Sequence, residues 1–211
     1  GPVADGFLVC VPEVMMRFGH WDEILPEPSP KGDLPVSQAL WRFTRAVALT
    51  ALDRKEEARK ERSLFAAAVR KVPQDATVGN NKASDIFFIA SRVLEGEVAA
   101  KEGQYDKAVT LLRAAAKRED TLRYDEPPDW FQPVRHTLGA VLTKAGRHKE
   151  AEQSYREDLV RFPENGWALS GLSRSLELQG RVIEAQEIRA RAELAWRDKD
   201  IEPQSTCYCL K

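Results

Sequence analysis

The residues of this sequence that could do chemistry are few and scattered. Two thiols, Cys207 and Cys209, lie two residues apart near the end of the chain. Thiolates at that spacing can share a soft metal such as Cu(I) or Zn, or form a strained, reducible disulfide. A structural zinc site needs four ligands, so Cys10 and a histidine would have to converge on the pair. One hypothesis is therefore a metal- or redox-responsive module, and the alternative is an incidental tail or one with buried thiols.

The remaining candidates for catalysis form no constellation. The adjacent carboxylates Glu157 and Asp158 would diverge from a helix, so they make a poor general acid and base pair. Histidines stand at positions 20, 136 and 148 without cysteine or carboxylate at ligand spacing, and we expect surface or core roles for them. The sequence contains no glycine-rich phosphate loop, nucleophile elbow or HExxH pair. It therefore predicts a protein that is not an enzyme and uses no cofactor.

Charge and hydropathy argue against two classes of partner. The 211 residues carry 32 basic and 33 acidic side chains, for a net charge of −1. So small a charge offers no overall electrostatic reason to bind nucleic acid or an anionic membrane. No run approaches the roughly eighteen apolar residues of a membrane span, and the few cysteines favour a reducing compartment. We expect a cytoplasmic protein with neither partner. Gly1-Pro2 is typical of a cleaved tag, so we expect the natural protein to begin earlier.

A recurring six-residue phrase organises the elements that position these residues. The phrase at Gly146 to Ala151 (GRHKEA) returns at 103–108 and 180–185, with looser copies at 19–24 and 53–58. Apolar residues at helical spacing flank the copies, which predicts a turn between two helices at each. From the last residue of one copy to that of the next, the spacings are 34, 50, 43 and 34 residues. Two of them equal the period of the tetratricopeptide repeat, and the other two exceed it by insertions.

The finer pattern resembles the tetratricopeptide repeat family closely. Counted from Gln132, small residues occupy the eighth and twentieth positions, a large residue the twenty-fourth and a proline the thirty-second: Gly139, Ala151, Tyr155 and Pro163. In such a repeat the small residues let two antiparallel helices approach, the large one fills the space toward the next pair, and the proline ends the second helix. The resemblance implies an all-α solenoid of antiparallel helix pairs, with about ten helices.

The predicted organisation has three parts. Residues 1–36 would form a partial N-terminal helix pair and a Pro-rich connector, 37–199 the repeats, and 200–211 a C-terminal tail. The repeats are expected at about 39–72, 89–118, 132–165 and 166–199, with loops at 73–83 and 119–129. The first helix is expected to carry an apolar stripe of Phe7, Leu8, Val11, Val14, Met15 and Phe18.

Several longer runs resemble one group of larger bacterial and algal tetratricopeptide proteins. They include Tyr124 to Trp130 (YDEPPDW), Pro163 to Trp167 (PENGW) and Arg17 to Leu25 (RFGHWDEIL). That group implies no activity to carry over, but it suggests that this chain is the C-terminal part of a longer array. A first helix pair without a neighbour exposes apolar surface. Missing residues, a partner or a second copy of the chain would cover it, so a homodimer through the end helices is a further hypothesis.

The concave face of the solenoid is the expected binding surface, because the resemblance implies that the first helix of each pair lines it. We expect a mixed groove with a basic bias that receives a protein or peptide segment, with arginine for bidentate contacts and tryptophan as an anchor. An ordinary solvated face with a structural tryptophan is the alternative. The carboxylate clamp of the family's chaperone-binding members is absent. The candidate residues on this face are Arg135, His136, Lys144, Trp167 and Arg174.

The loop before the third repeat is the sharpest local feature, with acidic and aromatic residues on a stiff Pro127-Pro128 turn. It could fold across the groove and bring Tyr124 and Trp130 to a partner. The alternative is a packing device in which both aromatic side chains are buried and Asp125 or Asp129 caps a helix. We expect Asp129 to cap the following helix, which would include Trp130.

Overall fold

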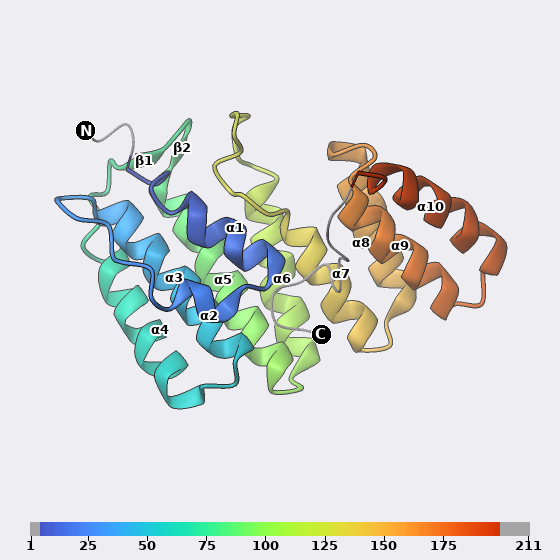
Figure 1. Ribbon diagram of the computed structural model, residues 1–211, viewed down its shortest axis with the longest axis horizontal. Coiled ribbons are helices and arrows are strands. Elements are labelled where there is room, and N and C mark those ends of the chain that lie inside the picture. Colours follow the sequence, from blue (N-terminus) through green and yellow to red (C-terminus); the bar gives the residue numbers. More distant parts are fainter. Residues whose placement is uncertain (1–4, 199–211) are drawn as a thin grey trace.

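The computed structural model describes residues 5–198, and within them the chain is an all-α helical-repeat solenoid with one short hairpin (Figure 1). Neighbouring helices pack as antiparallel pairs: α3 with α4, α5 with α6, α7 with α8, and α9 with α10. The helices are α1 (Cys10–Phe18), α2 (Trp21–Ile24), α3 (Pro35–Ala51), α4 (Lys55–Val69), α5 (Ala83–Lys101), α6 (Tyr105–Glu119), α7 (Val134–Lys144), α8 (His148–Arg161), α9 (Gly166–Leu178) and α10 (Val182–Ala195). The strands β1 (Thr77–Val78) and β2 (Asn81–Lys82) form the hairpin.

The recurring phrase begins at the turn that ends the first helix of each pair. At all five copies the backbone enters the left-handed region, with φ between 58° and 77°, at Gly19, Asp53, Gly103, Gly146 and Gly180. The next residue's amide then donates to a carbonyl five residues earlier, as from Arg147 to Leu142 over 2.9 Å. Glycine adopts this conformation without the steric cost that a Cβ brings, and aspartate is among the residues that tolerate it. The five turns therefore share one geometry.

The helix pairs approach each other through glycine. A Cβ built on Gly139 of α7 would lie 2.4 Å from the ring of Tyr155, and one on Gly171 of α9 would lie 2.3 Å from it. The ring of Tyr155, on α8, is therefore held between two helices that belong to successive pairs. The side chain is almost fully buried, and it joins the two pairs as the repeat pattern predicts.

The first helices of the pairs form one continuous row. Helix α3 packs on α5, α5 on α7, and α7 on α9. We call α3, α5, α7 and α9 the inner row. Its side chains form most of the core, among them Phe43, Ile89, Leu142 and Leu172, all fully or nearly fully buried.

The start of α7 corrects one expectation. The helix begins at Val134 and not at Asp129, so Trp130 lies outside it. The amide of Val134 donates to the carboxylate of Glu119, at the end of α6, over 3.0 Å. A side chain from the preceding helix thus satisfies an N-terminal amide that the sequence assigned to Asp129.

Glu119 gives this helix start a pH dependence. Burial raises the pKa of its carboxyl to about 7, against the lowering effect of the Val134 amide and of Arg161. Because the folded-state pKa lies above the unfolded one, the folded protein binds the proton more tightly, and stability from this group falls as pH rises toward 7. Glu119→Gln keeps an acceptor oxygen without a charge. We expect it to change stability little at pH 5 and to raise it by about 2 kcal/mol at pH 8.

Chemical denaturation at the two pH values measures this effect. Glu164→Gln is the matched control, because Glu164 forms an exposed ion pair with Arg191 and exposed pairs contribute little. A Glu119→Gln variant that is no more stable than the parent at pH 8 would contradict the assignment.

The two insertions between repeats dock on each other. Asn81 of β2 donates through its side-chain amide to the Arg123 carbonyl and to the Asp129 carboxylate, over 3.0 and 2.6 Å. Its carbonyl oxygen accepts from the Arg123 amide over 2.8 Å. The backbone amide of Asn80 donates to Asp125 over 3.0 Å. Both segments were expected as separate loops, and together they form one hydrogen-bonded unit at one edge of the solenoid.

Candidate partner-binding site

Helix α1 crosses the inner row (Figure 1). Its residue Arg17 contacts two of the predicted groove residues, His136 and Trp167. The guanidinium of Arg17 stacks on Trp167, with its carbon 3.9 Å from the ring centroid. It also donates to Nδ1 of His136 over 3.0 Å, across 119 residues of sequence. Phe18 adds a tilted ring contact with Trp167, 6.1 Å between centroids. A segment of the chain itself is therefore bound on the face that the sequence assigned to a partner.

His136 connects three helices at this crossing. Its side chain is fully buried, and Nε2 lies 2.8 Å from the Asp158 carboxylate of α8. Because Arg17 is always a donor, Nδ1 accepts and Nε2 carries the proton. Burial lowers the pKa of His136, and the nearby Arg17 charge lowers it further, while Asp158 opposes both. The histidine is therefore a neutral link between α1, α7 and α8, and its ring is not open to solvent.

Trp167 lies at the centre of an aromatic cluster at the C-terminal end of the solenoid. The ring of Trp196 meets it edge-on, with centroids 5.1 Å apart and an interplanar angle of 85°. The indole N–H of Trp196 donates to the Ser170 hydroxyl over 3.2 Å. Through its contacts with Arg17, Phe18 and Trp196, Trp167 joins α1, α9 and the end of α10. The alternative of a structural tryptophan is thus correct for part of its surface, although the residue stays partly exposed.

Helix α1 is anchored at its beginning as well. The carboxylate of Asp5 accepts from the amides of Val36 and Ser37 over 3.0 and 2.7 Å, at the first turn of α3. The Gly6 amide donates to the Ser37 hydroxyl over 2.8 Å. These contacts place α1 on the inner row at both of its ends.

The outward face of α1 is apolar. On one face of the helix, Pro12 and Met16 are buried, as is Val9 just before it. On the opposite face, four large apolar side chains are each 45–56% exposed, and we call them the α1 stripe: Leu8, Val11, Val14 and Phe18. The apolar stripe expected for this helix is present, but its members Leu8, Val11, Val14 and Phe18 are largely exposed. The face that is buried carries Pro12 and Met16, and the contacts of Arg17 with Trp167 and His136 hold the end of the helix in this orientation.

Glu13 is an acidic residue of α1 with a shifted pKa. The residue is only half-buried, yet burial of its carboxyl raises the pKa to about 8. It is therefore largely neutral at pH 7, which suits a helix that lies on apolar neighbours.

The other predicted groove residues are separated by the structure. Arg135 is engaged away from the crossing, by two bonds to Asp120 of 2.7 and 2.9 Å and one to Glu157 of 3.2 Å. These partners raise its pKa. Lys144 and Arg174 are exposed, two turns beyond His136 and Trp167 on the inner row. Arg174 pairs with Glu177 over 3.2 Å.

The two aromatic residues of the acidic loop differ in burial. Trp130 is buried against Phe43 and Phe131, with ring centroids 5.7 and 5.6 Å apart. Tyr124 is 78% exposed, and its hydroxyl donates to Glu126. The packing interpretation is therefore correct for Trp130 and wrong for Tyr124. Asp125 and Asp129 receive bonds from the hairpin and cap no helix.

No metal site is visible in the part of the chain that the structure describes. No group of three or more His, Cys, Asp or Glu side chains is placed to hold an ion among residues 5–198. Cys10 is an exposed free thiol at the start of α1. Cys207 and Cys209 lie outside the described residues. Over the described range, none of the helices has the length and apolar character to cross a bilayer.

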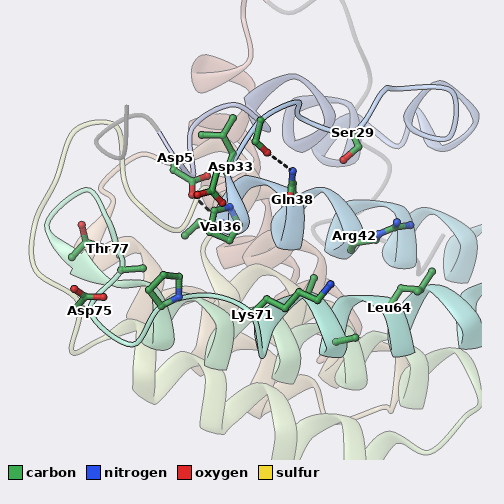
Figure 2. Close-up of a pocket in the computed structure, with 17 residues that line it drawn as sticks. Asp5, Ser29, Asp33, Val36, Gln38, Arg42, Leu64, Lys71, Asp75 and Thr77 are labelled. Atoms are coloured by element: carbon green, nitrogen blue, oxygen red, sulfur yellow. Dashed lines mark hydrogen bonds between the residues drawn. The ribbon is translucent and has the colours of Figure 1, made fainter.

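A large cleft lies at the other end of the inner row (Figure 2). It has a volume of about 1230 Å³ and is lined by the connector, by α3 and α4, and by the segment before the hairpin. Its charges are mixed, with Asp33 and Asp75 opposite Arg42 and Lys71. Arg42 is paired with Glu61 over 2.8 Å. The cleft marks the exposed side of the first full helix pair, where a stacked repeat would pack, and it contains none of the predicted site residues.

Sequence reasoning missed Arg17 and Phe18 as contributors to the site. Both belong to the run from Arg17 to Leu25 that resembles other proteins, and Phe18 was also expected in the apolar stripe of the first helix. A charged residue beside the expected apolar stripe was the one available signal, and it does not reveal a contact with residues so far away in sequence.

Comparison with known proteins adds one similarity. No known protein family matches the chain, and no solved structure matches it. The chain is 29% identical over 133 residues to cellulose synthase 1 operon protein C of Komagataeibacter xylinus. The matched region is about 60% of this chain and 9% of that protein, so the chain spans less than a tenth of its relative. Together with the ten paired helices, this similarity is consistent with a tetratricopeptide-like protein.

Proposed function

We propose that this protein is a non-catalytic scaffold whose concave face binds a segment of a protein partner. The observation that carries the proposal is the binding of α1 on the inner row. Arg17 of α1 stacks on Trp167 and donates a hydrogen bond to His136. A surface that binds one helical segment by stacking and hydrogen bonding has the chemistry to bind another. The similarity to cellulose synthase 1 operon protein C is additional support for a scaffold.

The accessible part of this face defines the partner's chemistry. Because α1 covers His136 and part of Trp167, a partner meets the α1 stripe and the two exposed cations beyond it, Lys144 and Arg174. Lys144 and Arg174 lie about two helical turns, roughly 11 Å, beyond His136 and Trp167. A helix or extended segment with apolar side chains followed by carboxylates would match both features. Apolar anchors would supply most of the affinity, and the carboxylates would supply orientation.

Substitutions in matched pairs test the proposal, once affinity purification of the full-length protein and mass spectrometry have identified a partner. We expect Val14→Asp to weaken its binding at least tenfold, because a carboxylate would replace an apolar contact. Val160→Asp is the control, since Val160 is an exposed valine of α8, on the opposite helix layer. Arg174→Glu should weaken binding more than Arg156→Glu, which changes an exposed arginine of α8.

Isothermal titration with the purified partner gives the four affinities, and thermal melts confirm that each variant is folded. The proposal is wrong if Val14→Asp and Arg174→Glu bind as tightly as their controls.

A further inference from the structure

We propose that the cleft of Figure 2 binds an extended segment of a protein partner that carries one basic and one acidic side chain. We call it the connector cleft, because residues 29–35 of the connector form one wall, opposite α4 and residues 71–77. It lies at the other end of the inner row from Trp167. The inference therefore adds a second site, with its own class of ligand, to the function proposed above.

The size and walls of the connector cleft suit an extended peptide. Its volume of about 1230 Å³ exceeds the roughly 300–1,000 Å³ of most small-molecule pockets. Two walls are irregular backbone, and neither the amide of Asp33 nor that of Asp75 donates a hydrogen bond within residues 5–198. Main-chain groups of this kind can bond the backbone of an extended ligand. Leu64, Ala67 and Ala68 of α4 supply an apolar surface between the walls.

Three charged side chains that line the connector cleft are unpaired. Within the part of the chain that the structure describes, Asp33, Asp75 and Lys71 form no ion pair and no side-chain hydrogen bond. In the view of Figure 2, Lys71 extends toward Arg42 and away from the two aspartates. Opposite charges that line one cleft without pairing leave room for the charges of a ligand. A lysine or arginine suits the aspartate end, and a carboxylate suits Lys71.

The same charges argue against a stacked helix pair as the occupant. Where successive pairs of this chain meet, the contact is apolar, as between Tyr155 and Gly171. A helix pair packed over the connector cleft would bury Asp33, Asp75 and Lys71, and burial of a charge is costly unless the group gains a partner. An extended segment with charges of its own supplies those partners.

Selection of peptides on the full chain tests the proposal. The probe is a library of random twelve-residue peptides displayed on phage, which is first depleted on the variant that carries Asp33→Asn, Asp75→Asn and Lys71→Gln. Depletion removes peptides that bind elsewhere, such as on the α1 stripe, so the result does not depend on the function proposed above. We expect the enriched peptides to share one basic and one acidic residue at a fixed separation.

Isothermal titration with one enriched synthetic peptide then measures the role of Lys71. We expect Lys71→Glu to weaken binding by about tenfold or more, and a lysine in place of the peptide's acidic residue to restore most of that loss. Lys60→Glu is the matched control, because Lys60 is an exposed lysine of α4 that does not line the cleft. It should change the affinity by less than about twofold.

Three results would overturn the proposal: no enrichment over the depleting variant, enriched peptides without the shared charge pair, or equal affinities for Lys71→Glu and Lys60→Glu. Thermal melts check the fold of each variant. Asp33, Asp75 and Lys71 are all exposed, so we expect the parent's melting temperature to be kept. No residue of α1 or of the predicted groove is changed, so loss of the partner-binding proposal would leave these outcomes unaltered.

Discussion

Gly139→Ala is expected to destabilise the protein by about 2 kcal/mol, although alanine is the better helix former. The added Cβ would lie 2.4 Å from the Tyr155 ring, a distance at which something must move. The ring cannot retreat, because Gly171 approaches it as closely from the next helix pair. Overpacking of a filled core costs about 1–3 kcal/mol, and the gain of about 1 kcal/mol in helix propensity offsets part of it.

A comparison with Gly96→Ala isolates the cause. At Gly96 the new Cβ would meet Leu112 at 2.9 Å, and a leucine side chain can change rotamer where a ring held on both sides cannot. We expect Gly96→Ala to cost less than half as much as Gly139→Ala in chemical denaturation. Tyr155→Leu should remove most of the penalty of Gly139→Ala in a double-mutant cycle. If the two single substitutions cost the same, the clamped ring is not the reason for the glycine.

Asn81→Asp is expected to cost about 3 kcal/mol at pH 7, because one buried side chain holds the two insertions together. Asn81 is almost fully buried, donates to Arg123 and Asp129, and accepts from the Arg123 amide. A carboxylate would lose both donors and would place a charge beside Asp129. Burial already raises the pKa of Asp129, and the nearby Asp125 adds to that shift. Unpaired buried polar groups and charges carry costs of this order.

The pH dependence separates charge from geometry. The new carboxyl would be destabilised in its charged form, so its folded-state pKa would lie above the unfolded value. Stability should therefore recover as pH falls from 7 toward 4.5, as measured by denaturation at each pH. Asn81→Ala should be destabilised without that recovery. Asn80→Ala is the second control, because Asn80 is exposed and its amide group makes only one bond to Tyr124 among the described residues. A pH-independent loss in Asn81→Asp would contradict the electrostatic account.

The candidate site shows where sequence reasoning stops. His136, Trp167 and Arg174 were placed correctly on the first helices of their pairs, because the repeat phase decides which residues share a face. What those residues contact was not predictable. Arg135 is adjacent to His136 in sequence, yet it pairs with Asp120 and Glu157 instead of facing α1. Neighbours on a helix point about 100° apart, and only the packed structure shows which partner each one meets.

The repeat, its turns and its glycines could be predicted from the sequence, because each depends on residues within one helix pair. A left-handed turn at Gly146 and a close approach at Gly139 follow from the residue type at a known position. Three features were decided by the tertiary structure alone: the packing of α1 on the inner row, the docking of the two insertions, and the burial of Trp130. Each joins segments far apart in sequence, so no local pattern shows which residues meet. Helix α1 carries apolar residues on two sides, and contacts with distant residues, by Arg17 at one end and by Asp5 and Gly6 at the other, accompany the burial of one side and leave the α1 stripe exposed.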